Sequence, residues 1–369
     1  MVLKKCRSYD AGEVRQAVHE SLSSLLEEED LPLAGKQILL KPNLAAARRP
    51  ERCVTTHPEV VGAAIDFFKE RGCSVGVGDS PAGALRGVRR VWENTGMLGV
   101  CEAKGARLVN LEAGGWVERS VGSRTYRVSR ALLDFDHVVS LPKLKTHVLT
   151  LITAAVKNMY GCMPGFGKSE LHLANPKPPA MSRVLVDVFC LAKPWISLVD
   201  AVEAMEGNGP SSGQVRRLGF VAASRDAVAL DVKLADLLGI DPLKVPTTRE
   251  AHRRGLWKDV PGSIKVTGAS EVDLRVRDFK VPANWHFYLI PDRLARLAGK
   301  WFWVKPLVVY DKCTGCGECE GICAASAVSM EDGKAKVSRE ECVSCLCCIE
   351  ACPAGAMEPR MSALARLLT

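Results

Sequence analysis

The 369-residue sequence contains no run of about 18 uncharged apolar residues, the length that a membrane-spanning helix needs. Its first residues, MVLKKCRSYDAGEVRQ, also lack the apolar core and small-residue cleavage site of a secretory signal peptide. These two absences predict a cytoplasmic protein without transmembrane helices. Because that compartment is reducing, and because a chain of this length can bury a large core, we expect no structural disulfide bonds.

The sequence also lacks a recognised nucleic-acid-binding motif, although its formal net charge is +8. The charge is uneven, because Lys305–Glu358 contains five basic and nine acidic residues and so carries −4. The remainder therefore carries +12. We expect no nucleic-acid partner, and we interpret the basic part either as a surface for an anionic small molecule or as an ordinary solvated surface.

Cysteine, in contrast, is abundant, and its spacing is the strongest signal in the chain. Nine of the 15 cysteines lie between Cys313 and Cys352, and the other six have no ligand spacing, which predicts buried free thiols. The cluster consists of two runs, Cys313-x2-Cys316-x2-Cys319-x3-Cys323 and Cys342-x2-Cys345-x2-Cys348-x3-Cys352-Pro353. Each ligand position of the first run maps onto the second by a shift of 29 residues, which indicates an internal duplication.

This repeated spacing is typical of [4Fe–4S] ligands, because three thiolates of one loop reach three corners of a cubane and the fourth ligates the other cluster. Zinc rarely shows the same spacing twice. We therefore assign Cys313, Cys316, Cys319 and Cys352 to cluster I, and Cys323, Cys342, Cys345 and Cys348 to cluster II. Cys347 is interpreted as an extra thiol that is not a ligand; the alternative is that it replaces a neighbouring ligand.

The same segment resembles the small α+β two-cluster ferredoxin domain of bacteria. It departs from that pattern at Ala324, where a Pro usually follows the fourth Cys. The segment between the runs, Ala327–Val337, is predicted to form a hairpin with Asp332 and Gly333 in its turn. The resemblance implies two [4Fe–4S] clusters and an external electron donor or acceptor as a partner.

The preceding part of the chain alternates strand and helix signals, which predicts an α/β fold. We expect a mostly parallel open sheet with flanking helices. The expected strands are 37–40, 74–78, 107–110, 137–141, 195–200 and 218–222, and the expected helices are 58–71, 149–160, 181–192 and 226–238.

Several predicted strands are followed by polar residues, and ligands of open parallel sheets bind at the carboxyl ends of the strands. These residues are Lys41 and Asn43, Asp79 and Ser80, Lys143 and Lys145, and Asp200. Their convergence predicts a binding site at one edge of the sheet.

The richest candidate is Leu141–His147, which places two lysines and a histidine within five residues. Lysine suits phosphate or carboxylate groups, and histidine suits proton transfer near neutral pH. The same reasoning adds Lys157, Asn158 and His172 further along the chain. The alternative is a solvated basic loop. The nearby Gly161–Ser169 is not a P-loop, since Cys162 stands where that motif needs Gly.

A second candidate is Asp200–Gly213, whose carboxylates at Asp200, Glu203 and Glu206 suit a cation or acid–base chemistry. Its glycines allow a backbone to approach a ligand closely. The alternative is a long flexible loop.

Six short motifs, in this order, resemble the iron–sulfur proteins of the domain-of-unknown-function family 362. They are Lys41-Pro42-Asn43, Thr56-His57-Pro58, Gly78-Asp79-Ser80-Pro81, Pro142-Lys143-Leu144-Lys145-Thr146-His147, Lys157-Asn158 with Gly161, and Glu206-Gly207-Asn208-Gly209-Pro210. The resemblance covers about residues 36–255. It implies that the Lys143–His147 and Glu206–Gly209 segments form one site, and it names no substrate.

Two functions fit these observations. The first is a ferredoxin-linked oxidoreductase, whose two clusters exchange electrons with a small anionic substrate or an additional cofactor. Its candidate catalytic residues are His147, Lys145 and His172, and its candidate ligand-binding residues are Lys41, Asn43, Asp79, Ser80, Lys143, Lys157, Asn158, Glu206, Asn208 and Gly209. The second is a non-catalytic electron carrier, or an assembly factor for iron–sulfur or metal cofactors, that docks a partner protein. The polar convergence favours the first.

We expect four parts: an α/β domain at 1–283, an aromatic and basic linker at 284–305, the two-cluster domain at 306–358 and a tail at 359–369. The linker holds six of the 21 aromatic residues. We interpret it as a helix that docks the ferredoxin domain. The alternative is contact with a membrane surface or a partner protein. A homodimer is compatible with the sequence, which does not specify oligomeric state.

Overall fold

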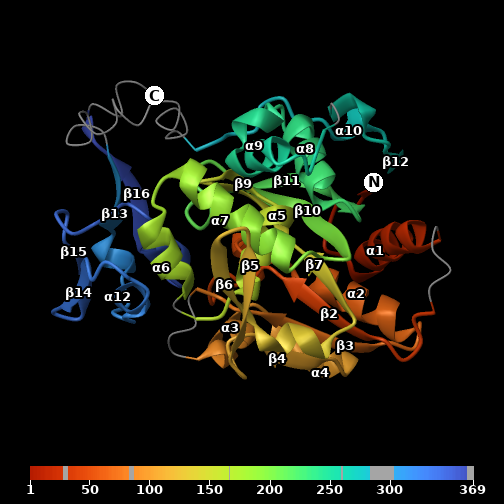
Figure 1. The fold of residues 1–369 in the computed structure, drawn as a ribbon, viewed down its shortest axis with the longest axis horizontal. Helices are drawn as coiled ribbons and strands as arrows, with labels where there is room; N and C mark the ends of the chain where they lie inside the picture. The colour runs from red at the N-terminus through yellow and green to blue at the C-terminus, as the bar shows by residue number, and fades with distance from the viewer. Residues whose placement is uncertain (28–31, 83–86, 166, 259–260, 283–302, 364–369) are drawn as a thin grey trace.

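The computed structural model describes residues 1–27, 32–82, 87–165, 167–258, 261–282 and 303–363 (Figure 1). Below, "the body" means the described part of 1–282, and "the dicluster domain" means 303–363. Most of the expected linker, 284–305, lies outside the described residues. Among the described residues, no helix is both long and apolar enough to cross a bilayer.

One large sheet organises the body. Its strand order is β12 (Thr267–Gly268), β1 (Val2–Lys5), β11 (Gln214–Ser224), β10 (Ile196–Glu206), β7 (His137–Leu141), β2 (Gln37–Pro42), β3 (Ser74–Asp79) and β4 (Arg107–Asn110). The run from β10 to β4 is parallel throughout, while β11 is antiparallel to β10 and β1. The predicted mostly parallel α/β fold is confirmed.

Two further strands extend this sheet near β10. Strand β8 (Lys143–His147) pairs in parallel with β10, and β9 (Leu151–Thr153) pairs antiparallel with β8. All five residues of β8 are buried. The alternative of a solvated basic loop at this segment is therefore wrong.

Helices cover both faces of the sheet (Figure 1). They are α1 (Ala11–Leu26), α2 (Pro58–Lys69), α3 (Val88–Asn94), α4 (Met97–Lys104), α5 (Ala155–Asn158), α6 (Gly167–Ala174), α7 (Pro178–Leu191), α8 (Ala227–Leu237), α9 (Pro246–Arg253) and α10 (Glu271–Leu274). Because successive strand side chains point to opposite faces, Leu198 packs in one apolar core and Val199 in the other.

Short elements complete the body. They are the hairpin β5 (Trp116–Val121) and β6 (Arg124–Ser129), and the 3-10 turns η1 (Pro50–Arg52), η2 (Arg130–Asp134), η3 (Met159–Cys162), η4 (Pro242–Lys244) and η5 (Pro261–Ser263).

The helix expected at 149–160 is wrong, because the structure has β9, α5 and η3 there. The reason is a tertiary contact that the local sequence does not show. The buried Asp231 carboxylate, from α8, accepts hydrogen bonds from the amides of Ala155 (2.7 Å) and Val156 (3.1 Å). This carboxylate satisfies the first free amides of a helix and so starts α5 at Ala155.

The dicluster domain contains two small antiparallel pairs and two short helices. Its elements are β13 (Val304–Val308) with β16 (Met357–Met361), β14 (Val328–Glu331) with β15 (Lys334–Val337), α12 (Glu318–Gly321), α13 (Cys347–Ala351) and η7 (Tyr310–Lys312). Asp332 and Gly333 both have positive φ, 47° and 72°. That is the conformation of a tight two-residue hairpin turn, so the predicted hairpin is confirmed.

The body and the dicluster domain share an apolar contact. Val148 and Leu149, in the turn after β8, pack in the same cluster as Val308, Ile349 and Met357 of the dicluster domain. The end of β8 therefore reaches the apolar interior of the dicluster domain, and this contact positions the site described next.

Candidate functional site

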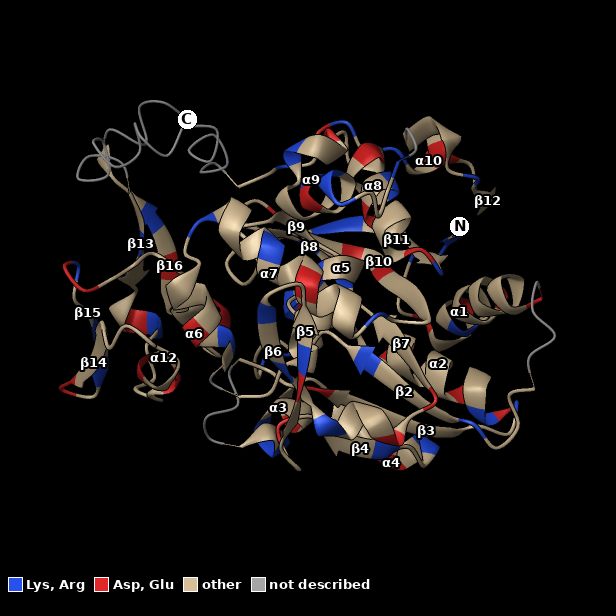
Figure 2. Ribbon diagram, in the orientation of Figure 1, with Lys and Arg blue, Asp and Glu red and all other residues tan. Residues whose placement is uncertain are grey.

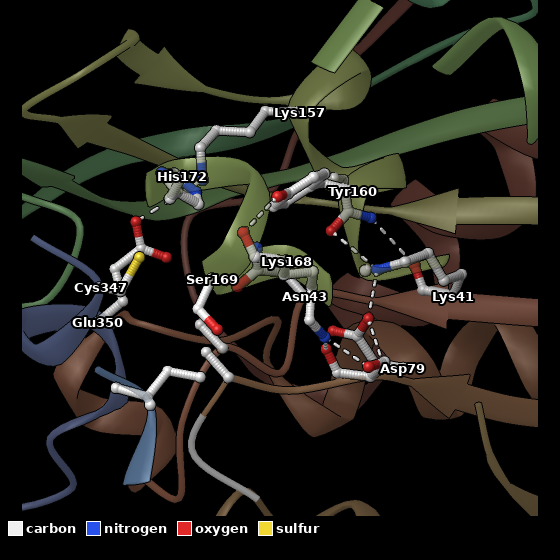
Figure 3. A pocket seen from close by; sticks show the side chains of 16 residues that line it. Lys41, Asn43, Asp79, Lys157, Tyr160, Lys168, Ser169, His172, Cys347 and Glu350 are labelled. Atoms are coloured by element: carbon white, nitrogen blue, oxygen red, sulfur yellow. Dashed lines mark hydrogen bonds and ion pairs between the residues drawn. The ribbon is translucent and has the colours of Figure 1, made fainter. Parts of the chain in front are cut away.

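A cavity of about 70 Å³ lies between the body and the dicluster domain (Figure 3). We call it the interdomain pocket. Strands β2 and β3 supply one wall at their carboxyl ends, the α5–α6 region supplies a second, and the dicluster domain supplies a third. The lining residues are Lys41, Asn43, Ala45, Asp79, Ser80, Ala82, Lys157, Asn158, Tyr160, Gly161, Lys168, Ser169, His172, Ile322, Cys347 and Glu350.

The first wall is built on a buried ion pair. Lys41 and Asp79 lie at the carboxyl ends of the neighbouring parallel strands β2 and β3, and Lys41 Nζ lies 2.7 Å from Asp79 Oδ1. The carboxylate also accepts the amides of Leu44 (2.7 Å) and Ser80 (2.9 Å). Because both charges are satisfied within the protein, this pair shapes the pocket more than it offers a free charge.

Gly161 lies against that ion pair. A Cβ atom built at position 161 would collide with Asp79 Oδ1 and lie 2.7 Å from Lys41 Nζ. Asn158 completes the arrangement, since its side chain donates to the carbonyl of Lys41 (3.1 Å) and accepts from Lys41 Nζ (3.3 Å). A side chain at 161 would therefore displace the Asp79 carboxylate or the Lys41 ammonium group, because the backbone passes close to the ion pair.

Lys168 is a second buried cation at the pocket. Its Nζ donates to both the carbonyl and the hydroxyl oxygen of Ser80. The carboxylate of Glu112 lies 4.0 Å away. Burial lowers the pKa of Lys168 to about 8. Lys168 is therefore poised to gain or lose a proton just above neutral pH.

His172 brings an unsatisfied polar atom to the pocket. The residue is 4% exposed, and its Nδ1 has no hydrogen-bond partner among the described residues. Its ring meets Tyr160 edge-on, with centroids 5.6 Å apart. Burial lowers its pKa to about 4, so the ring is neutral at pH 7. A buried polar atom without a partner is costly, so this nitrogen is available to a ligand or to a water molecule.

The third wall is Glu350, which bridges the two parts of the chain. His147 Nδ1 accepts the amides of Leu149 (3.0 Å) and Thr150 (3.3 Å). The neutral ring therefore carries its proton on Nε2, which donates to Glu350 Oε1 at 2.6 Å. Burial lowers the pKa of His147 to about 4.

The neighbours of Glu350 stabilise its ionised form. Burial alone would raise its pKa, but Lys157 and His147 hold that pKa well below its usual range. Lys157 Nζ lies 3.9 Å from the same oxygen. Glu350 is therefore ionised, and it partly balances Lys157.

The three basic residues of β8 share one face of the strand but have different partners. Lys145 Nζ donates to Asn43 Oδ1 (3.2 Å) and to the carbonyl of Val54 (2.7 Å), so it lies behind a pocket-lining residue. Burial lowers its pKa to about 7. Lys143 instead pairs with Asp200 (3.0 Å) and does not line the pocket.

The Glu206–Gly209 segment also does not line the pocket. Glu206 accepts the amide of Lys280 at 3.1 Å, and Asn208 is exposed. The amide of Gly209 donates to Thr146 Oγ1 at 3.2 Å. The structure thus places this segment against β8, but its polar side chains face other partners, and the expected shared site is not formed at the interdomain pocket.

The cysteines assigned to cluster I converge. Cys313, Cys316, Cys319 and Cys352 all line one small cavity in the dicluster domain. Their thiol chemistry and convergence fit a cubane. No group of three or more His, Cys, Asp or Glu among the described residues is arranged to hold a single metal ion.

The cysteines assigned to cluster II are also mutual neighbours. Burial raises the pKa of Cys348 well above its usual range, and the thiols of Cys345, Cys342, Cys319 and Cys323 add to this effect; Cys345 and Cys323 are also neighbours of Cys342. The four cysteines assigned to cluster II likewise fit a cubane. Cys347 lines the interdomain pocket.

Sequence reasoning missed several residues of the site. Lys168 lies in a segment that fails the P-loop pattern, yet its ammonium group is at the pocket. Glu350 follows Cys348 by two residues, and only the contact with His147 reveals its place. Arg48 is buried and donates to the carbonyl of Cys352 through Nε (3.1 Å) and Nη2 (2.6 Å). No sequence motif marks any of the three.

Comparison with known proteins finds two family models in the chain. The model described as domain of unknown function DUF362 matches residues 38–236, and the model described as 4Fe-4S dicluster domain matches residues 305–353. A thylakoid-associated protein of Synechocystis sp. is 37% identical over 256 residues, which are 69% of this chain and 79% of that protein.

Among solved structures, the lactate racemase apoprotein from Thermoanaerobacterium thermosaccharolyticum is similar with a TM-score of 0.40 and 11% identity. The match covers 60% of this chain and 53% of the racemase chain.

Proposed function

The chain belongs to the DUF362 family and carries a 4Fe-4S dicluster domain, and from this premise we propose that it is an iron–sulfur oxidoreductase. Its substrate is a small anion held in the interdomain pocket. The observation that carries the proposal is that Cys347 and Glu350 line the same cavity as the lysines of the body. Cys347 stands between two cysteines assigned to cluster II, Cys345 and Cys348.

The class of ligand follows from charge and size. Three lysines and two carboxylates line the pocket, which gives its lining a formal charge of +1, and Glu112, 4.0 Å from Lys168, offsets part of that charge. One water molecule needs ~10–15 Å³ of cavity volume. A cavity of about 70 Å³ therefore holds on the order of five water molecules. An oxyanion or carboxylate of a few heavy atoms fits this space, and a nucleotide does not.

The chain's own residues supply binding and proton control. Lys157 and Lys168 attract the anion, and the free Nδ1 of His172 orients it. Lys168 has a pKa of about 8, which suits transfer of a proton near neutral pH. When bound, the clusters supply single electrons. The external partner would be a one-electron donor or acceptor.

The alternative is a non-catalytic carrier or an assembly factor. Such a protein needs a docking surface and cluster ligands, but it does not need a buried, positively charged cavity with an unsatisfied imidazole. The unpartnered Nδ1 of His172 therefore favours the enzyme.

The test is anion binding to the holoprotein purified without oxygen. Inorganic phosphate and formate serve as probes in titration calorimetry, and the electron paramagnetic resonance spectrum of the reduced protein reports whether the bound anion perturbs a cluster. We expect Lys168→Met and His172→Phe to weaken binding at least tenfold at unchanged iron content. The matched control is Lys193→Met, an exposed lysine away from the pocket. Equal affinity in all four proteins would refute the proposal.

A further inference from the structure

A second hollow lies beside the cysteines of cluster I. It is a groove of about 450 Å³ that shares no lining residue with the interdomain pocket. We call it the basic groove. Its lining residues are Ala47, Arg48, Arg49, Glu51, Arg52, Asn94, Lys312, Pro353, Ala354 and Gly355.

The groove is strongly basic. Four cations line it against a single carboxylate, Glu51. Arg49 and Arg52 are exposed, and neither forms an ion pair with the described residues. Lys312 pairs with Glu358 at 2.7 Å, but both side chains are largely exposed, so water screens this pair. Positive charge is therefore available to a partner in solution.

The groove lies directly against the backbone that carries cluster I. Lys312 immediately precedes Cys313, and Pro353–Gly355 immediately follow Cys352. Arg48 connects the groove to cluster I, because it lines the groove and donates hydrogen bonds to the carbonyl of Cys352. A protein bound in the groove would thus lie next to two of the four residues assigned to cluster I.

We propose that the basic groove docks an acidic one-electron carrier protein, which exchanges electrons with cluster I. One electron leaves the reduced carrier, which is oxidised, and enters this protein, which is reduced; no covalent bond forms or breaks. The inference rests on the proposed function only in requiring that the clusters carry electrons. It is independent of what binds in the interdomain pocket.

Charge complementarity identifies the partner as acidic. The Lys305–Glu358 segment carries −4, and exposed carboxylates such as Glu331, Asp332, Glu340 and Glu341 lie on its surface. Figure 2 shows acidic residues at the ends of β14 and β15, away from the body. An acidic carrier is repelled there and attracted to the groove, where the basic side chains belong mostly to the body.

The geometry also gives the two clusters different neighbours. Residues flanking cluster I line the basic groove, while Cys347, beside two ligands of cluster II, lines the interdomain pocket. Electrons from a docked carrier would then enter through cluster I and reach the pocket through cluster II. The order groove, cluster I, cluster II, pocket follows from these contacts.

The experiment measures binding of a small acidic [2Fe–2S] ferredoxin to the holoprotein, with both proteins oxidised, as a function of ionic strength. The test variant is Arg49→Glu/Arg52→Glu. The control, Arg119→Glu/Lys193→Glu, makes the same charge change at exposed residues outside the groove. We expect the test variant to bind at least tenfold more weakly at low salt and to lose most of the salt dependence, while the control binds like the native protein.

A second readout is the rate at which the reduced ferredoxin reduces the clusters, followed by freeze-quench electron paramagnetic resonance. We expect at least a tenfold fall in the test variant and an unchanged rate with dithionite, which needs no docking protein. The milder Arg52→Gln should give an intermediate fall, and iron content verifies that each variant is intact.

Ferredoxin binding that is equal in the native and test proteins would overturn the proposal, as would an equal loss in the control. Vesicles of phosphatidylglycerol provide a further arm: loss of vesicle binding in the test variant, with ferredoxin binding unchanged, would assign the groove to a lipid surface instead. Lys168→Met keeps the groove intact, so it should bind ferredoxin normally even if the pocket proposal fails.

Discussion

The imidazole of His147 lies 2.6 Å from the carboxylate of Glu350. His147 ends β8, which pairs with β10 and β9 of the body's sheet, and Glu350 lies on α13, two residues after Cys348. Because two backbone amides occupy Nδ1 of the ring, the proton on Nε2 points at the carboxylate. This polar link between the body and the dicluster domain therefore also positions Glu350, which lines the interdomain pocket.

Neutralising Glu350 should make the pocket more attractive to anions. In Glu350→Gln the amide oxygen still accepts the hydrogen bond from His147, while Lys157 loses its compensating charge. We expect phosphate affinity to rise roughly tenfold, since a neighbouring charge changes binding by about 1 kcal/mol or more at partly buried sites. Calorimetry measures it. A fall in affinity with unchanged iron content would contradict the role given to Glu350.

Anion affinity should depend on pH through Lys168. Burial lowers its pKa to about 8, so the ammonium is charged below pH 8 and neutral above it. We expect the affinity for formate, which stays ionised throughout this range, to be nearly constant between pH 6.5 and 7.5 and to fall as pH rises through 8, by up to about tenfold per pH unit. Lys168→Arg keeps the charge and should bind with little change up to pH 9. A native profile that is flat to pH 9.5 would count against this assignment.

Gly161→Ala should break the Lys41–Asp79 ion pair. The added methyl group collides with the carboxylate, and separating a buried pair costs roughly 3 kcal/mol. We expect a large drop in the denaturation midpoint and loss of phosphate binding. Gly99→Ala is the matched control, because a Cβ at that position in α4 meets nothing within 4 Å. Equal stability of the two variants would be inconsistent with the packing described here.

Cys347 should prove dispensable for cluster binding. Its residue lines the pocket, and its thiol contacts both the carbonyl of Cys345, at 4.0 Å, and the side chain of Cys345. We expect Cys347→Ala to keep the iron content of two cubanes. Cys348→Ala, one residue later, should lose about half of the iron. Iron and sulfide analysis of anaerobic protein decides between them, and a loss of iron in Cys347→Ala would make Cys347 a ligand.

Arg48 should raise the reduction potential of cluster I. It is a buried cation whose hydrogen-bond partners are the carbonyls of Cys352 and Ser211. Reduction adds negative charge nearby, which a positive charge stabilises. We expect Arg48→Gln to lower that potential by roughly a few tens of millivolts and Arg48→Lys to change it less. Potentiometric titration monitored by electron paramagnetic resonance measures both, and a higher potential in Arg48→Gln would refute this role.

Local pattern predicted the strands well where each strand buries its own apolar residues. The predictions at 74–78, 107–110 and 137–141 match β3, β4 and β7 to within one residue. It failed at 149–160, where a helix was expected throughout. There the Asp231 carboxylate caps α5 at Ala155, although it is more than 70 residues away in sequence. The residues just before this cap form the strand β9 instead of a helix. Local helix propensity cannot predict this cap, because the capping carboxylate reaches the helix only when the chain has folded.

In the candidate site, too, local pattern predicted some residues, and tertiary contacts decided the rest. Lys41, Asn43, Asp79, Ser80, Lys157, Asn158 and His172 were predicted from strand ends and motifs, and all line the pocket. Lys143 was predicted with them but pairs with Asp200. Lys143 and Lys145 have the same chemistry and point to the same face of β8, so only their neighbours on other strands distinguish them.

The sequence by itself determined the fold class, the family and the presence of a 4Fe-4S dicluster domain. These depend on periodicity, on motif order and on cysteine spacings of two or three residues, which bring thiolates together within one loop. Only the tertiary structure decided what the site is made of. The pocket joins Lys41 to Glu350, and the basic groove joins Arg49 to Gly355. Residues about 300 positions apart meet because the turn after β8 packs into the dicluster domain, and no local pattern encodes that contact.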